Sequence, residues 1–438
     1  MLKDIYKSLG VSEVGARTSG DTAVALNTLP WHRKEIVDIS ETECAVACGS
    51  GSVLSLRAFK GAASGEKEVT IQEVSKGIFV MENANLRVRV EDGVITSLYD
   101  HREEREVIAS GGKANQFVIF DDKPLYWQAW DVEVFHLDTR KELSTKSSQI
   151  GEDKANRVSV VTETKISENS SIRTTISLSA ALGDAPSAVE VTADVDWHET
   201  MKFLKVEFPV DVRATEANYE TQFGVVRRPT HYNTTWDMAK FEVCCHKFAD
   251  LSESGYGVSV LNDSKYGFAT VGNLMRLSLL RSPKAPDAHA DMGTHTIRWA
   301  IFPHAGALGH ATVRKAFEFN NPLKVVAGSP AATDALKKFP VRLTGDASLV
   351  LDTVKRGEDD EDVSTAENLP KRKGRSVVLR IYDSLGGRSR GTIETSWDVK
   401  RVAKTNVLED ELEEVEVKDG KFDIDLRPFE VATYRLQL

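Results

Sequence analysis

Cysteine is scarce in this chain of 438 residues, which has four: Cys44, Cys48, Cys244 and Cys245. Two of them follow a C-x3-C spacing and two are adjacent, and neither arrangement matches a zinc knuckle. So few cysteines in so long a chain exclude a scaffold built on disulfides. They favour a reducing compartment.

Basic residues are fewer than acidic ones, with 56 Lys and Arg against 66 Asp and Glu, which gives a net charge of −10. We find no basic stripe, and this composition argues against a nucleic-acid partner. The sequence also lacks a signal peptide and an apolar run long enough to cross a membrane. We therefore expect neither nucleic acid nor membrane among its partners.

The usual catalytic signatures are missing as well. There is no G-x-S-x-G elbow, no G-x-G-x-x-G and no phosphate-binding loop. Cys244, Cys245 and His246 place a thiol beside a histidine, but adjacent residues of a strand point to opposite faces. A buried cysteine is the simpler interpretation, and we assign no catalytic residue to this chain.

Two H-x-D pairs, His136 with Asp138 and His289 with Asp291, could each present two metal ligands on one face of a strand. The second pair continues to His295 but lies in a loop rich in Pro, Ala and Asp, and His136 lies in an apolar segment that suits a core histidine. We therefore expect no metal site in this chain.

The pattern that is present has a period of two, which predicts strands. Alternation before and after Asp92-Gly93 is typical of a β-hairpin, and the first ten residues read as the tail of a helix that stops at Gly10. Helical periodicity is otherwise confined to 311–319, so we expect less than roughly 15% helix, well below the usual share. Further strands are predicted at 158–164, 172–178, 189–195, 204–210 and 429–436.

These strands predict an all-β protein: a large antiparallel β-sandwich flanked by smaller β-sandwich units. We place a short helix and a small β-unit at 1–75, the large sandwich at 76–335 and a small terminal sandwich at 336–438. The charged runs 358–362 and 371–375 predict a flexible, solvated hairpin loop, to which we assign no function.

Polar and aromatic side chains of the kind that bind sugars gather in residues 223–253. Sugars offer hydroxyl groups at the rim and C–H groups on the face, which suit carboxylates, amides and aromatic rings. A polar loop that satisfies its own backbone, or a sandwich core with hydrogen bonds at its edge, would give the same composition. Arg298, alone in an apolar strand, fits either a substrate contact or a buried ion pair. The candidate substrate-adjacent residues are Trp130, Asp131, Arg228, His231, Asn233, Trp236, Asp237 and Arg298.

Several ordered segments, from about residue 20 to the C-terminus, also carry a family resemblance. They resemble the C-terminal β-region of glycoside hydrolase family 38, the α-mannosidases, of the fungal vacuolar and cytosolic type. Besides the 223–253 stretch, the segments are AVALNTLPWHRKEIV (Ala23–Val37), NLRVRVEDGVITSLYDHREEREVI (Asn85–Ile108), GGKANQFVIFDDKPLYWQAWDVEVFHLD (Gly111–Asp138), VDWHETMKFLKVEFPV (Val195–Val210), GYGVSVLNDSKYG (Gly255–Gly267) and HTIRWAIFPHAG (His295–Gly306).

The resemblance implies a central sandwich of the galactose-mutarotase-like supersandwich type. It also implies a retaining, zinc-dependent enzyme that removes terminal α-linked mannose from oligosaccharides. The family's zinc, nucleophile and acid/base belong to an N-terminal barrel that we expect to be missing here or to be a separate polypeptide. We expect no zinc bound by this chain itself.

We therefore expect the C-terminal portion of an α-mannosidase, with a mannose-containing oligosaccharide and the barrel as partners. Two alternatives stay open: a non-catalytic mannose-binding or scaffold protein, and one half of a split enzyme. We expect a cytoplasmic location, with delivery to the vacuole and association between copies of the chain left open.

Overall fold

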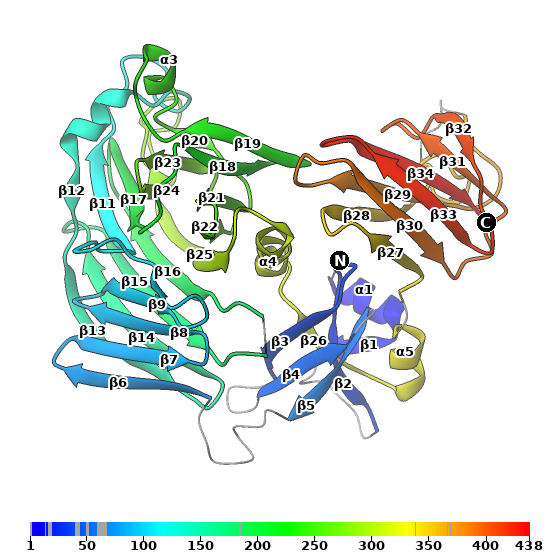
Figure 1. Ribbon diagram of the computed structural model, residues 1–438, viewed down its shortest axis with the longest axis horizontal. Coiled ribbons are helices and arrows are strands. Elements are labelled where there is room, and N and C mark those ends of the chain that lie inside the picture. Colours follow the sequence, from blue (N-terminus) through cyan, green and yellow to red (C-terminus); the bar gives the residue numbers. More distant parts are fainter. Residues whose placement is uncertain are drawn as a thin grey trace. The chain divides into compact units, whose positions relative to one another are not determined.

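The structure is a computed structural model, and it describes residues 2–13, 15, 20–39, 44–49, 52–58, 68–183, 185–337, 339–365, 367 and 370–438. Of the residues described, 53% lie in strands and 9% in helices. The paired strands are antiparallel throughout the sheets, which confirms the predicted all-β fold (Figure 1). The side chains of Cys44 and Cys48 lie outside what is described.

The chain divides into two compact units. The first unit comprises residues 1–57, 222–225 and 323–438, and the second comprises 58–221 and 226–322. The three blocks expected from the sequence stay a prediction.

The second unit is built on three sheets. The longest runs in the order β13 (Thr145–Asp153), β14 (Arg157–Lys165), β15 (Ser171–Ser179), β16 (Val189–Trp197), β25 (Gly293–Ala305), β22 (Tyr256–Asn262), β21 (Phe248–Ser252), β18 (Glu216–Thr221) and β19 (Gly224–Pro229). The next has the order β12 (Lys141–Glu142), β11 (Gln116–Asp121), β17 (Lys202–Pro209), β24 (Leu274–Arg281), β23 (Gly267–Val271) and β20 (Val243–Cys244). The third has the order β10 (Arg105–Glu106), β9 (Val94–Asp100), β8 (Leu86–Glu91), β7 (Ile78–Asn83) and β6 (Val69–Ser75).

These strands lie where the period-two pattern predicts them. The hairpin at Asp92-Gly93 joins β8 and β9, and both residues have positive φ, 47° and 80°. Those two values are what a two-residue hairpin turn of the primed type requires. The second unit also holds the helices η2 (Val134–Thr139), α3 (Thr235–Met238) and α4 (His310–Asn320), the last of which matches the helix predicted at 311–319.

Two of these sheets pack face to face in the second unit. Trp299 of β25 is fully buried, its ring centroid lies 6.0 Å from that of Phe117 on β11, and its indole N–H donates to Asn115 Oδ1 at 2.9 Å. Because side chains alternate along a strand, Arg298 projects from the opposite face of β25, away from this core. The outer face of the β11–β17–β24 sheet carries the site described below.

The first unit contains an N-terminal sheet and a C-terminal sandwich. The N-terminal sheet has the order β1 (Val11–Glu13), β26 (Lys324–Gly328), β2 (Thr22–Leu26), β5 (Val53–Ala58), β4 (Cys44–Gly49) and β3 (Arg33–Asp38). It is accompanied by α1 (Leu2–Leu9), which ends at Gly10 with φ +68° as predicted, and by α5 (Pro330–Ala335). Strand β26 inserts between β1 and β2, although some 300 residues of chain separate it from them.

The C-terminal sandwich has two sheets around one core that includes Leu379, Ile381, Ile393 and Tyr434. One sheet has the order β27 (Val341–Gly345), β30 (Ser389–Thr395) and β33 (Lys421–Leu426). The other has the order β28 (Leu349–Arg356), β29 (Ser376–Asp383), β34 (Val431–Gln437), β31 (Arg401–Thr405) and β32 (Glu411–Val415). Strand β34 confirms the terminal strand expected at 429–436.

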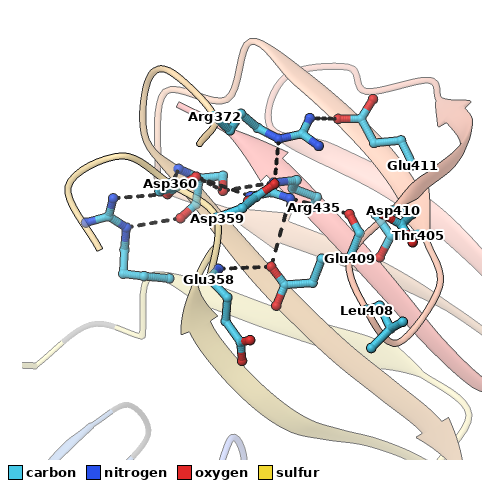
Figure 2. Close-up of polar contacts among 12 residues, drawn as sticks. Glu358, Asp359, Asp360, Arg372, Thr405, Leu408, Glu409, Asp410, Glu411 and Arg435 are labelled. Carbon is cyan, nitrogen blue, oxygen red and sulfur yellow. Dashed lines mark hydrogen bonds and ion pairs between the residues drawn. The ribbon is translucent and has the colours of Figure 1, made fainter. Parts of the chain in front are cut away.

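The charged segment between β28 and β29, expected to be a flexible, solvated hairpin loop, is joined to the sandwich by ion pairs at its described residues. Figure 2 shows the guanidinium of Arg435, on β34, between the carboxylates of Asp359 and Glu409. Asp360 is 1% exposed and accepts hydrogen bonds from the Ser376 N–H and hydroxyl, both at 2.7 Å. Arg372 bridges Asp359 and Glu411. Most of the charged residues in 358–362 and 371–375 are exposed, as expected of a solvated loop, while the buried Asp360 and its partners form a network that ties the segment to the sandwich.

The protonation of this network follows from its hydrogen bonds. Burial raises the pKa of Asp360, but donors on Ser376, Arg356 and Arg435 lower it by more, and the net pKa lies below its ordinary value. The carboxylate therefore stays ionised, and Arg435 has a charged partner wherever the protein is folded at neutral pH.

Replacing Arg435 by Ala should destabilise the C-terminal sandwich by about 3–5 kcal/mol, because buried carboxylates would lose their counter-charge. The measurement is the free energy of unfolding from urea titrations. Arg390→Ala is the matched control, since Arg390 pairs with Asp425 but its side chain is 78% exposed, and its loss should cost less than about 1 kcal/mol. Equal costs for the two variants would show that the network does not hold the segment.

Candidate functional site

Two segments of the second unit cover the outer face of the β11–β17–β24 sheet. We call residues 122–133, between β11 and η2, the tryptophan loop, and residues 230–242, between β19 and β20, the α3 segment. In Figure 1 both lie at the same end of the second unit, with α3 at the tip. The α3 segment contacts η2, which follows the tryptophan loop: the ring centroids of His136, in η2, and Phe241 are 5.9 Å apart.

The strand β17 determines what lies beneath these segments. Its residues are buried on both faces, so that Leu204, Val206 and Phe208 enter the sandwich core while Lys205 and Glu207 lie on the outer face. The Lys205 ammonium contacts Glu242 of the α3 segment at 2.5 Å. A buried charge needs such a partner, so this ion pair holds the end of the α3 segment on the sheet.

A second cluster of charges lies beside Lys205 on the outer face of the sheet. Glu207 pairs with Arg276 of β24 at 2.7 Å and with Arg140 at 2.6 Å. The Arg276 guanidinium also lies 5.4 Å from the ring centroid of Phe120. The sheet therefore presents a charged, paired and buried surface, which the covering segments exclude from water.

Burial of this layer shifts the pKa of two of its groups. Burial lowers the pKa of Lys205, and Glu242 partly opposes that effect. Burial, with the nearby charge of Lys205, also lowers the pKa of His136 to about 4. The His136 Nδ1 lies 2.7 Å from the Glu133 carbonyl, to which it donates in the neutral form that this pKa implies at neutral pH. The expectation that His136 is a hydrogen-bonded core histidine is confirmed, although it lies in η2 and not in a strand.

Arg281, at the end of β24, fixes the tryptophan loop. It pairs with Asp122 at 2.7 Å and donates to the carbonyls of Gln128 at 3.0 Å and Asp131 at 2.6 Å. The backbone N–H of Lys284 donates to the Gln128 side chain at 2.9 Å. These bonds hold the loop from its inner side and leave its outer side chains in solvent.

The outer side chains of the loop are large and apolar. Leu125, Tyr126, Trp127 and Trp130 are 68%, 74%, 70% and 68% exposed, and the two indole rings meet edge to face with centroids 6.1 Å apart. Single exposed apolar residues are ordinary, whereas contiguous ones mark a binding surface. This loop therefore has the composition of an interaction site.

Trp127 also has an unusual backbone conformation, with φ +53°. The left-handed region is a rare place for a bulky residue and costs on the order of 1–2 kcal/mol. Its carbonyl accepts from the N–H groups of Trp130 and Asp131, which closes the turn. Strain of this kind gathers at functional sites, and here it presents an exposed indole that the described residues do not cover.

The α3 segment is more polar. Thr234 caps the short helix by accepting from the Asp237 N–H at 3.1 Å, and its hydroxyl donates to the Asp237 carboxylate at 2.9 Å. His231 Nδ1 lies 3.6 Å from the same carboxylate. Trp236 is 80% exposed beside these groups. An exposed indole next to a carboxylate, an imidazole and the exposed Asn233 is a combination suited to a sugar.

The candidates predicted from the sequence fall into two groups. Trp130 and Asp131 on the tryptophan loop, and His231, Asn233, Trp236 and Asp237 on the α3 segment, cover the same sheet. Arg228 precedes them on β19, half-buried, and its Nε has no partner among the described residues. Trp130 and Trp236 are exposed rather than in a sandwich core.

Arg298 does not join this surface. It pairs with Asp263 at 3.6 Å and lies 4.5 Å from the ring centroid of Phe319 in α4, on the face of β25 that is turned away from the core. Arg298 thus forms an ion pair, one of the two roles expected for it. Its position does not support the other role, contact with the substrate, which stays a prediction.

Sequence reasoning missed Leu125, Tyr126 and Trp127 as site residues. The available signal was a run of large apolar residues directly after a proline in a stretch bounded by charge. Only Trp130 and Asp131 of this stretch were singled out, and the apolar run was not considered as a surface of its own.

No group of three or more His, Cys, Asp or Glu side chains able to hold a metal ion occurs within the described residues. The His295 ring contacts the Asp291 backbone carbonyl at 2.8 Å. The residues present here do not fit a zinc site. Of the adjacent cysteines, Cys245 is buried and Cys244 exposed, as alternation predicts.

Comparison with known proteins agrees with this architecture. The model of the glycosyl hydrolases family 38 C-terminal domain matches residues 81–289, and that of the family 38 C-terminal beta sandwich domain matches residues 348–434. Together they match more than half of the chain. The chain therefore belongs to glycosyl hydrolase family 38.

Individual relatives are α-mannosidases. The chain is 47% identical over 378 residues to the α-mannosidase of Saccharomyces cerevisiae, covering 82% of this chain and 34% of that protein. It is 37% identical over 431 residues to human α-mannosidase 2C1, covering 94% and 39%. An α-mannosidase structure from Enterococcus faecalis V583 shares the fold, with a TM-score of 0.66 at 13% identity over 99% of this chain and 52% of that chain. The chain thus spans little more than a third of the curated relatives.

Across the described residues, the structure has no helix long and apolar enough to cross a membrane.

The buried His136 makes stability depend on pH. Because the folded protein disfavours its protonation, the unfolded chain binds more protons between pH 6.5 and about 4. The free energy of unfolding should therefore fall as the pH is lowered through that window, by at most about 1.4 kcal/mol per pH unit from this group. His136→Phe should flatten this slope in urea titrations at several pH values.

Phe203→Leu is the control for that experiment, since it alters the ring that lies 5.5 Å from His136 without removing a titratable group. It should lower stability by a similar amount at every pH. An unchanged slope in His136→Phe would show that another group carries the acid sensitivity.

Proposed function

We propose that this chain is the C-terminal, non-catalytic portion of an α-mannosidase that removes terminal α-linked mannose from oligosaccharides. The observation that carries the proposal is the similarity to curated α-mannosidases, at 47% and 37% identity, over 34–39% of their length. The catalytic groups are assigned to the unmatched N-terminal portion of such an enzyme.

The family resemblance implies zinc and two carboxylic acids in that N-terminal portion, where the metal would bind sugar hydroxyls. The described residues of this chain do not assemble a zinc ligand set, so no chemical step is assigned to them. What the chain supplies is a surface beside the substrate. Trp236 offers a ring for the sugar face, and Asp237, His231 and Asn233 offer hydrogen-bonding groups for its rim. Trp130 and Asp131 extend that surface along the tryptophan loop.

A second candidate is a carbohydrate-binding protein that acts by itself. The exposure of Trp130 and Trp236, 68% and 80%, favours it, because exposed aromatic rings are what sugar stacking requires. One half of a split enzyme is the third candidate. A cytoplasmic location with free thiols at Cys244 and Cys245, and association between copies of the chain, stay predictions.

The chain alone should show no turnover of an aryl α-mannoside with or without added zinc, because no catalytic carboxylate pair is assigned to it. A chimera in which this chain replaces the matching C-terminal portion of the S. cerevisiae α-mannosidase should turn over the same substrate. Turnover by the chain alone at the rate of the chimera would contradict the proposal. An inactive chimera that folds cooperatively, together with sugar binding by the chain alone, would support the carbohydrate-binding alternative.

In the active chimera, Trp236→Ala should lower kcat/KM by roughly five- to tenfold, equivalent to about 1–1.4 kcal/mol of lost aromatic contact. Asp237→Asn should lower it by a similar factor, because a neutral amide accepts weaker hydrogen bonds than a carboxylate does. Neither change should lower the unfolding midpoint of the free chain by more than a few degrees, since Trp236 lies in solvent. Lys240→Ala, an exposed position in the same segment, is the control. Loss of stability with normal kcat/KM would assign both side chains a structural role.

A further inference from the structure

The tip of the tryptophan loop differs in chemistry from the α3 segment. Its consecutive residues Leu125, Tyr126 and Trp127 are 68–74% exposed, and Phe135 of η2 is 57% exposed. Leu125 is aliphatic and has no hydrogen-bonding side chain. A contiguous apolar surface of this kind on a protein marks a site for another protein surface.

Several neighbouring polar groups are occupied: Asp122 pairs with Arg281 at 2.7 Å, and the Arg281 guanidinium also donates to the Gln128 and Asp131 carbonyls. The exposed Asp131 carboxylate belongs with Trp130 to the surface proposed for the sugar, whereas Leu125, Tyr126 and Trp127 themselves carry no carboxylate or imidazole. The tip therefore suits a dry, apolar contact better than a polyhydroxylated ligand.

The loop is also held in shape before any partner arrives. Arg281 and the Lys284 N–H fasten its inner side, and Trp127 keeps φ +53° although its indole lies in solvent. A rigid loop loses little conformational freedom on association, which is the advantage of a preorganised binding surface. Aromatic residues at such a position are typical of the energetic centre of a protein interface.

We propose that Leu125, Tyr126 and Trp127 are the docking surface for the N-terminal catalytic portion of the α-mannosidase. This inference rests on the proposed function. Its occupant is chosen because the chain spans only 34–39% of its curated relatives, so most of such an enzyme must pack on a surface of this portion. The α3 segment is held over the same sheet through Glu242, and its Phe241 contacts η2. If the catalytic portion docks on Leu125, Tyr126 and Trp127, the polar α3 segment lies at the edge of the interface.

The test is oxidative footprinting of the free chain and of the chimera with the S. cerevisiae N-terminal portion, read by mass spectrometry. Tyr126 and Trp127 should oxidise several-fold more slowly in the chimera, in the absence of any mannoside. Leu408 of the C-terminal sandwich, 80% exposed, is the reference and should react equally in both. Equal reactivity of Tyr126 and Trp127 in a cooperatively folded chimera overturns the docking surface. If the chimera does not fold, the same comparison is made on the two portions co-expressed as separate chains.

Turnover separates this inference from the proposed function. An active chimera with unprotected Tyr126 and Trp127 rejects the docking surface and leaves the proposed function standing. Protection in an inactive chimera supports the docking surface and counts against the proposed function. Protection of the two residues in the free chain by mannobiose would overturn the inference in favour of a sugar subsite.

A variant tests whether the surface instead binds a second copy of this chain. Trp127→Asn keeps a residue that tolerates positive φ, so the free chain should retain its unfolding midpoint. In the chimera it should accelerate proteolysis at the junction of the two portions and lower kcat by several-fold. A free chain that sediments as a dimer, and as a monomer after Trp127→Asn, would assign the surface to a second copy of this chain and overturn the proposal.

Discussion

The ion pair between Lys205 and Glu242 is the interaction on which the candidate site depends. Strand β17 is buried on both faces, so a lysine at position 205 has no route to solvent and must find a partner within the protein. Removing one member of such a pair leaves an uncompensated buried charge, at a cost of about 3–5 kcal/mol. The requirement draws the end of the α3 segment onto the sheet and thereby positions Asp237, Trp236 and His231 above it.

The same constraint recurs at Arg281 and in the C-terminal sandwich: a charge that is shielded from water must be paired. Arg281 uses a buried carboxylate and two carbonyls to fasten a loop whose outer side chains are apolar. Arg435 uses Asp359, Asp360 and Glu409 to fasten a charged segment. In each case an arginine fits because its planar fork satisfies several acceptors at once. Loops that would otherwise be mobile become rigid supports.

The two segments of the site are both fixed to the sheet but differ in the chemistry of their outer side chains. The tryptophan loop is fixed from below and presents Leu125, Tyr126 and Trp127, whereas the α3 segment presents hydrogen-bonding groups around Trp236. Under the proposed function, the first surface meets the catalytic portion and the second meets the substrate. The presence of one apolar and one polar surface is consistent with membership of glycosyl hydrolase family 38.

The sequence by itself determined the strand pattern, the hairpin at Asp92-Gly93, the helix that stops at Gly10 and the helix at 311–319. These follow from local rules, since alternation, turn chemistry and helix termination act over a few residues. The family followed from the resemblance of several ordered segments. It also indicated which side chains of the α3 segment could bind a sugar. Only the tertiary structure decided that β26 inserts between β1 and β2, that Arg298 turns away from the site, and that Asp360 is buried. Those outcomes depend on partners distant in the chain, such as Arg435 for Asp360 and Phe319 for Arg298, and a local pattern carries no information about which distant charge or ring will lie opposite.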